Sequence, residues 1–185
     1  MNERIAKARL ELLSGTISET LDADNEGNEK MYEYSASYAE PANRRILGSW
    51  KVLDHTVNGR HYQEEFMERA LRGTAAGDIT YEATYEFSRN MCVKRVLICC
   101  LIDAEDGHAT YEYHMNLVLG WEVRGKTLSV QPITGYQYTL IDGKPTSVQD
   151  LPPNPEWIRI RANVDGNTLV LEDGGDVKTL ERVIQ

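Results

Sequence analysis

Two stretches of this chain alternate between apolar and polar residues, and this alternation constrains the fold more than any other feature. The first runs from Ile79 to Ser88 and the second from Ala109 to Leu119. Successive side chains of a β-strand point to opposite faces of a sheet, so a period of two predicts strands with one buried and one solvated face. Between them, Met91 to Ile102 becomes apolar on both faces toward its end, which predicts a strand that is covered on both sides.

Turn-forming residues separate these runs and recur toward the end of the chain. They are Asn58-Gly59, Arg89-Asn90, Asp106-Gly107, Arg124-Gly125, Asp142-Gly143, Asp165-Gly166-Asn167 and Gly174-Gly175. Gly, Asn and Asp tolerate the positive φ of tight hairpin turns, and hairpins make neighbouring strands antiparallel.

The spacing of the turns predicts about eight or nine strands, a number that closes around side chains or one small ligand. The expected strands lie near residues 46–57, 79–89, 91–103, 108–123, 126–132, 135–141, 157–164, 168–173 and 177–184. An open sheet of this kind has two unpaired edges, and closing it removes them. The prediction is therefore a mostly β protein, an antiparallel up-and-down closed barrel.

Two helices are expected beside the strands. Apolar residues recur at helical spacing over 3–21, and this N-terminal helix is the natural cover for the outer face of the strand near 91–103. A second pattern over 61–72 predicts a short helix between the first two strands, with Gly73 as its stop. Its apolar stripe is Tyr62, Phe66, Ala70 and Leu71. This helix either plugs an open end of the barrel or gates entry to its interior.

The remaining segments set the limits of the barrel. Residues 22–43 are acidic, lack a period and close on Pro41, which predicts a loop or a partly disordered segment. Residues 151–155 are rich in proline, which lacks the donor that a sheet needs, so they predict an external connection. We therefore divide the chain into an N-terminal helix and acidic loop, 1–43, packed on or flanking the barrel, and a barrel domain, 44–185.

The charge of the chain excludes several classes of partner. Its formal net charge is -9, and an acidic surface without a basic stripe repels nucleic acid and anionic membranes. The chain has no run of about 18 apolar residues that could span a membrane, and it begins without an apolar signal core, which favours the cytoplasm. Cys92, Cys99 and Cys100 share one apolar run and are interpreted as small buried hydrophobes, not as a disulfide framework.

Short motifs mark the two ends of the strand series. Gly48-Ser49-Trp50 opens the first long strand, and Leu180-Glu181-Arg182-Val183 closes the last. In a closed meander the first and last strands are neighbours, so the Arg182 guanidinium can lie over the Trp50 indole. These motifs resemble the calycin superfamily, more specifically the bacterial lipocalin-like domains. The resemblance covers about residues 45–185 and implies a barrel that holds small apolar molecules, with Gly48, Trp50 and Arg182 in structural roles.

Motifs that carry catalysis or bind a cofactor are missing from the sequence. There is no phosphate-binding loop, no dinucleotide-binding glycine motif, no His-Glu-X-X-His, no Cys-X-X-Cys and no nucleophile elbow. We therefore expect no cofactor, no metal and no catalytic residue. His108 and His114 lie about 20 Å apart along one strand and cannot share a metal. We interpret them, with His55 and His61, as solvent-facing.

Acidic residues on neighbouring strands have a simple interpretation. Glu82, Glu86 and Glu112 could cluster, and clustered carboxylates can bind a cation or raise one another's pKa. Their parity is opposite to that of the apolar positions, which places them on the outer face of the barrel. Solvated charge explains them better than a site does.

Tyrosines at inward parity are the most suggestive feature for function. The cavity candidates are Tyr81, Tyr85, Phe87, Tyr111, Tyr113, Met115, Tyr136 and Tyr138. A buried tyrosine needs a partner for its hydroxyl, so several phenols facing one interior suit a cavity that holds an amphipathic ligand or ordered water. The alternative is a filled core with the hydroxyls reaching the barrel rim.

Three functions remain open at this point. The first is binding of a small, largely apolar or amphipathic molecule inside the barrel, which predicts an interior cavity of about 300 Å³ or more. The second is an interaction or inhibitor module with a filled barrel and an exposed apolar patch for a protein partner. The third is an enzyme with tyrosine or glutamate acid–base chemistry, which predicts a carboxylate or histidine facing the cavity beside a tyrosine.

Overall fold

The computed structural model describes residues 41–185 apart from positions 73, 75, 90, 106 and 185. The helix expected over 3–21, and the part of the expected loop before residue 41, lie outside the described residues. The strands are β1 (Gly48–Val57), β2 (Arg60–His61), β3 (Thr80–Phe87), β4 (Cys92–Ala104), β5 (Gly107–Arg124), β6 (Thr127–Ile141), β7 (Lys144–Leu151), β8 (Ile158–Asp165), β9 (Thr168–Asp173) and β10 (Asp176–Arg182). The helices of this part of the chain are α3 (Pro41–Ile46) and α4 (Tyr62–Ala70), and neither has the length and apolar character that crossing a membrane requires.

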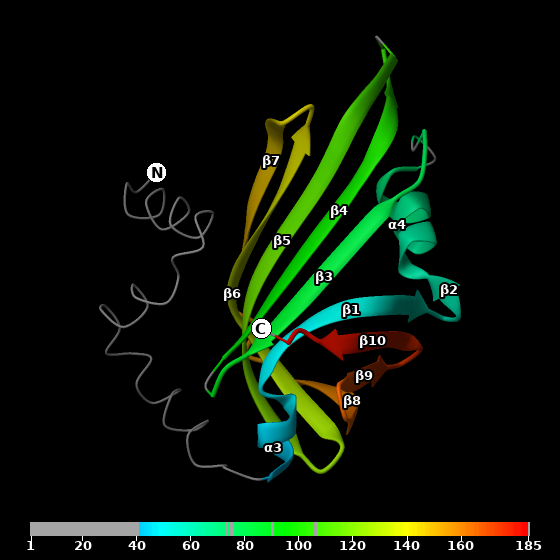
Figure 1. Ribbon diagram of the computed structural model, residues 1–185. Helices are drawn as coiled ribbons and strands as arrows, with labels where there is room; N and C mark the ends of the chain where they lie inside the picture. The colour runs from blue at the N-terminus through cyan, green and yellow to red at the C-terminus, as the bar shows by residue number, and fades with distance from the viewer. Residues whose placement is uncertain (1–40, 73, 75, 90, 106, 185) are drawn as a thin grey trace. The chain divides into compact units, whose positions relative to one another are not determined.

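The described strands form one antiparallel sheet that closes on itself (Figure 1). Its order is β10-β9-β8-β6-β5-β4-β3-β1, and pairing of β10 with β1 completes a barrel of eight strands, with β2 and β7 outside it. The predicted mostly β, closed antiparallel barrel is confirmed. The core lies inside the barrel, where Trp50, Ile98 and Leu180 are almost fully buried.

The barrel closes where β1 meets β10. The register places Trp50 directly opposite Arg182, and the guanidinium carbon lies 4.2 Å from the centroid of the indole. Directly opposed residues share a face of the sheet, so the contact follows from the register. A cation over an aromatic ring stabilises a structure by about 0.5–2 kcal/mol. The contact expected from the two terminal motifs is therefore present.

Arg182 also fixes the helix that precedes the barrel. Its two terminal nitrogens donate hydrogen bonds to the carbonyls of Leu47, at 2.6 Å, and Arg45, at 2.5 Å. The Trp50 indole N–H donates to the carbonyl of Ile46 at 2.7 Å. These donors satisfy carbonyls that the end of a helix leaves without partners. The expectation of a loop through residue 43 is therefore wrong at its end, and the domain boundary expected at 43/44 falls inside α3.

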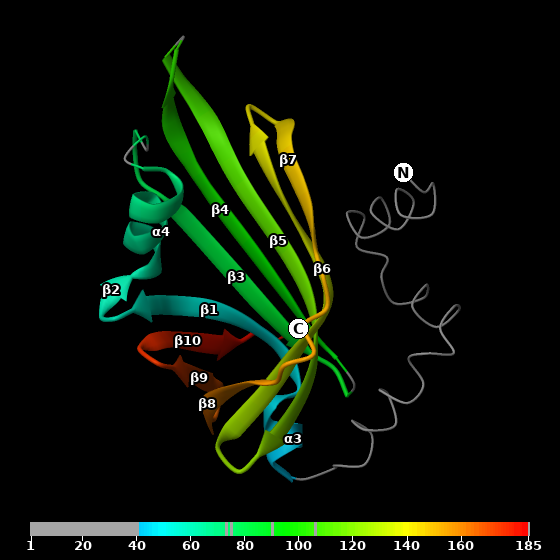
Figure 2. The ribbon, with the colours of Figure 1, turned by 180° about the vertical axis from the view of Figure 1, so that it is seen from behind.

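Strand β6 and its neighbour β7 differ from the sequence expectation. The strands expected at 126–132 and 135–141 are one strand, β6, despite Pro132. On the side of β6 away from β5, β8 pairs with 127–130 and β7 with 135–141, so Pro132 lies between these two partners and its missing N–H breaks neither ladder (Figure 2). Strand β7 was not expected, because its mostly exposed, polar sequence has no apolar alternation.

Helix α4 packs on the inner side of the sheet, between β2 and β3 in the chain (Figure 1). Phe66 lies 5.8 Å from Tyr113 and 6.5 Å from Tyr111, measured between ring centroids. The helix predicted over 61–72 is present but shorter. Arg72 adopts a positive φ of 49° directly after the C-cap residue, and the expected stop at Gly73 lies outside the described residues.

Replacing Gly48 by alanine should weaken the closure of the barrel. Gly48 has a φ of +112°, and a Cβ there would lie 2.9 Å from the Arg182 guanidinium. The clash opposes the Trp50–Arg182 contact and the positive φ strains an alanine backbone, so we expect Gly48→Ala to lower the free energy of unfolding by about 2 kcal/mol in urea denaturation. Gly120→Ala is the matched control, because a Cβ at Gly120 meets only ordinary contacts. Equal stability of Gly48→Ala and wild type would contradict this account of the closure.

Candidate functional site

A cavity of about 260 Å³ lies inside the barrel. It has room for about nine water molecules at their liquid volume of ~30 Å³ each. Its wall is formed by Tyr85, Phe87, Cys92, Lys94, Leu117, Leu119, Leu128, Val130, Pro132, Ile158, Ile160, Leu171, Asp173, Asp176 and Lys178. Most of this surface is aliphatic or aromatic, with a few charged groups, which is the composition typical of a small-molecule site.

Lys94 belongs to this wall because of its register. It lies on β4 directly opposite Tyr85 of β3 and Leu117 of β5, both of which line the cavity. Lys94 is not among the predicted cavity residues, although its parity indicates an inward position. Within the strand expected at 91–103, Lys94 has the same parity as Cys92 and Val96, which are buried. This parity predicts a lysine that faces the interior of the closed barrel.

Asp176 is the centre of a polar network at the wall. Its Oδ1 accepts a hydrogen bond from His55 Nε2 at 2.9 Å and forms an ion pair with Lys178. Burial alone raises the pKa of this carboxyl, but the hydrogen bonds from His55 and Lys178 outweigh it and lower the pKa to about 2. Asp176 is therefore ionised at neutral pH, and its charge is neutralised by Lys178.

The network continues from Asp176 toward helix α4. An ionised carboxylate can only accept, so His55 carries its proton on Nε2, and burial lowers the pKa of His55 so that the ring stays neutral. Its Nδ1, 3.0 Å from the Tyr81 hydroxyl, then accepts a hydrogen bond from that group. The ring of Tyr62, the first residue of α4, stacks on the imidazole with 4.3 Å between centroids. The interpretation of His55 as solvent-facing is wrong, because only 6% of it is exposed.

Lys94 has a different environment from Lys178. Its ammonium lies 5.6 Å from the centroid of the Tyr85 ring. Within the part of the chain that the structure describes, no side chain or carbonyl forms a hydrogen bond or an ion pair with it. Burial lowers the pKa of Lys94 to about 8, and the positive charge of Lys178 adds to this effect more than Asp176 offsets it. The cavity therefore contains an amine that is partly neutral near physiological pH.

The predicted cavity residues fall into three groups. Tyr85 and Phe87 line the cavity. Tyr81 does not line it but is hydrogen-bonded to His55, which in turn is hydrogen-bonded to the wall residue Asp176. Tyr111 and Tyr113 face the same side of the sheet but lie beneath Phe66 of α4. Met115 follows them on β5 and packs against the core cluster, outside the wall of this cavity.

Tyr136 and Tyr138 are on the opposite face of the sheet, so placing them in the interior was wrong. The register pairs Tyr136 with Asn116 and Tyr138 with His114, whereas the inward Tyr113 pairs with Thr139. The rings of His114 and Tyr138 stack with 4.5 Å between centroids. A β-bulge at the pairing of β5 with β6 shifts the register between Val118 and Leu119, and alternation within one strand could not reveal this shift.

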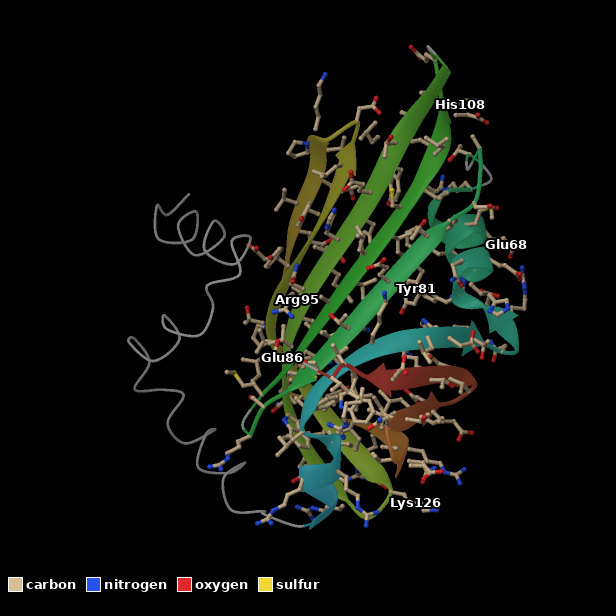
Figure 3. All side chains as sticks on the ribbon, in the orientation of Figure 1. Glu68, Tyr81, Glu86, Arg95, His108 and Lys126 are labelled. Carbon is tan, nitrogen blue, oxygen red and sulfur yellow. The ribbon has the colours of Figure 1, made fainter. Side chains whose placement is uncertain are left out.

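The outer face carries the expected acidic residues. Glu82 and Glu86 are exposed, and Glu86 pairs with Arg95 at 3.4 Å. Figure 3 shows Glu86 and Arg95 on the side of the sheet away from α4, with Tyr81 toward it. Glu112 accepts a hydrogen bond from His114 at 2.9 Å.

Two further histidines lie on the surface, and one of the three cysteines, Cys92, lines the cavity. His61 and His108 are exposed and lie close to Asp54 and Asp103, respectively. Cys92 and Cys100 are buried, Cys99 is half-buried, and all three are free thiols.

Replacing Lys94 by methionine should stabilise the protein at neutral pH. The pKa of Lys94 falls from 10.5 to about 8 on folding. Between pH 8 and pH 10.5, the Lys94 side chain therefore binds its proton more tightly in the unfolded chain than in the folded protein. The resulting penalty is complete below pH 8 and is relieved as pH rises to 10.5. We expect Lys94→Met to raise the free energy of unfolding at pH 7 by about 2 kcal/mol, less than the ~3.4 kcal/mol that the full shift corresponds to.

Urea denaturation from pH 6 to pH 10 measures this difference. The advantage of Lys94→Met over wild type should shrink above pH 8. Lys126→Met, which changes an exposed lysine of the β5–β6 turn, is the control and should show no such trend. A wild type that is more stable than Lys94→Met at pH 7 would contradict a buried, unpaired ammonium.

Comparison with protein-family models, curated proteins and solved structures gave no match for this chain. The resemblance to the calycin superfamily therefore remains a prediction that rests on Gly48, Trp50 and Arg182. Closed antiparallel barrels serve many unrelated functions, so the fold does not select one. The function has to be argued from the cavity and its wall.

Proposed function

We propose that the barrel binds one small amphipathic molecule in its interior cavity. The observation that carries this proposal is the 260 Å³ cavity, in which a mainly apolar wall surrounds a lysine without a partner among the described residues. This volume is slightly below the ~300 Å³ at which ligand pockets usually begin, so the ligand is small: a single ring or a short chain.

The wall suggests how such a ligand lies. Leu128, Val130 and Leu171 contribute apolar surface from three different strands, against which a hydrocarbon body can pack. Lys94 is the polar group that lacks a partner, because Lys178 is already paired with Asp176. A ligand with an electron-rich polar end satisfies Lys94, and this pairing offsets part of the cost of burying the amine.

The two competing functions have weaker support. An interaction module was expected to have a filled barrel, whereas this barrel holds a cavity. Its exposed large apolar side chains include the adjacent pairs Trp157–Ile158 and Val183–Ile184, and the others, Leu53, Leu101 and Val148, lie on three different strands. For an enzyme, the Tyr81–His55–Asp176 chain has the order of a nucleophile, a base and an orienting group. Only Asp176 of these three residues reaches the cavity wall, and a carboxylate with a pKa of about 2 is a poor general base.

Filling the cavity should abolish ligand binding. We expect benzyl alcohol, a small amphipathic probe, to shift the amide NMR signals of cavity-lining residues with a Kd below about 1 mM. Val130→Phe places a ring in the cavity and should weaken this binding at least tenfold, as should Leu171→Phe from another strand. Val148→Phe is the matched control, because Val148 is 53% exposed on β7.

Circular dichroism and thermal melting establish that each variant is folded. Unchanged probe binding in both folded cavity-filling variants would refute the proposed site.

Native mass spectrometry of gently purified wild type tests the same proposal without a probe, because a bound ligand adds mass that is lost on denaturation.

A further inference from the structure

We infer that Lys94 is a nucleophile that forms an imine with a small aldehyde or ketone bound in the cavity. This inference rests on the proposed function, since it specifies the chemical class of the ligand and the atom that engages it. It differs from non-covalent binding in predicting a covalent bond between the Lys94 Nζ and the carbonyl carbon.

The surroundings of Lys94 are those that make an amine reactive. A lysine becomes nucleophilic when it is desolvated in an apolar pocket or placed beside another cation. Both conditions hold here: Lys94 lies between Tyr85 and Leu117 across the sheet, and Lys178 is the nearby cation. The pKa of about 8 that results leaves part of the amine unprotonated, as attack on a carbonyl requires.

The wall favours a carbonyl group over a carboxylate at this position. A buried carboxylate needs several hydrogen-bond donors, and the described residues of the wall include no arginine, histidine, serine, threonine, asparagine or glutamine. Its acidic members, Asp173 and Asp176, repel a second anion. A neutral carbonyl compound meets no such repulsion and needs only the one amine.

The other nucleophilic groups of the wall are less suited to the reaction. Burial raises the pKa of the Cys92 thiol, which keeps it protonated and unreactive. Burial likewise raises the pKa of the Tyr85 hydroxyl well above its usual value. Lys178 is held by its ion pair with Asp176. Lys94 is therefore the group best prepared for attack.

The reaction is balanced without a further reactant. The unprotonated amine adds to the carbonyl carbon, and a proton moves from nitrogen to oxygen to give a carbinolamine. Loss of water then leaves a carbon–nitrogen double bond, so the carbonyl oxygen departs with both hydrogens of the amine. Among the described residues, the charged and titratable groups around Lys94 are His55 from β1, Tyr85 from β3, Cys92 from β4, and Lys178 and Asp176 from β10, and Asp173 of β9 lines the same cavity.

Trapping with borohydride tests the inference. Wild type is equilibrated with benzaldehyde at pH 7 and quenched with sodium borohydride, which reduces an imine to a stable secondary amine. We expect the intact mass to rise by the mass of benzaldehyde less one oxygen atom, and peptide mapping to place the adduct on Lys94. The yield at Lys94 should rise to half its maximum near pH 8, whereas ordinary lysine amines respond nearer pH 10.4.

Two variants and one unreactive probe separate the possible failures. Lys94→Arg keeps the charge but cannot form an imine, and it should lose the adduct. Lys126→Arg, outside the cavity, should retain it. If benzyl alcohol binds in the wild-type cavity but benzaldehyde is never trapped on Lys94, the imine is refuted and the proposed binding function stands. If benzyl alcohol does not bind either, both proposals fail. An adduct spread evenly over exposed lysines would also refute the inference.

Discussion

The antiparallel pairing of β1 with β10 closes the barrel, and its register places the residues that these two strands contribute to the site. Arg182 lies over Trp50 and caps α3, and Gly48 leaves the space that the guanidinium needs. Farther along the same two strands, the register brings His55 opposite Lys178. A register shift between Val52 and Asp54 separates the two pairs, so one strand pairing carries both the closing contact and, beyond the shift, the β10 residues of the cavity wall.

The interior combines features that conflict with stability. A barrel of this size could be filled by apolar side chains, which would remove the cost of burying an amine. Lys178 and Asp176 offset each other as an ion pair, whereas among the described residues the Lys94 ammonium has no hydrogen bond or ion pair and lies near the ring of Tyr85. Such a residue reduces the stability of the fold and supplies a reactive or binding group, which is the combination that functional sites show.

Much of the barrel could be predicted from the sequence, because alternation and turn residues are local signals. The strands at 79–88 and 109–119 and the contact of Trp50 with Arg182 were of this kind. Strand β7 is polar and exposed, so its sequence has no periodic signal. Pro132 led to a prediction of two strands where β6 is one, because only the assembled sheet shows that Pro132 lies between the segments that pair with β7 and β8. Helix α3 was missed because its carbonyls are capped from the far end of the chain.

The site was harder to predict because its groups come from distant strands. His55 meets Tyr81 and Asp176 only after the barrel closes, and the bulge between β5 and β6 reverses the expected facing of Tyr136 and Tyr138. The inward position of Lys94 could be predicted from its parity alone, but a charged residue within an apolar run is not expected in the interior of a barrel.

The most direct test of this account is the titration of Lys94 itself. In protein labelled with carbon-13 at the lysine side chains, the resonance that disappears in Lys94→Arg reports on this one amine. The account predicts that its chemical shift changes with a midpoint near pH 8. A midpoint near the ordinary value of about 10.4 would place the Lys94 ammonium in water and contradict both the buried amine and the chemistry proposed for it.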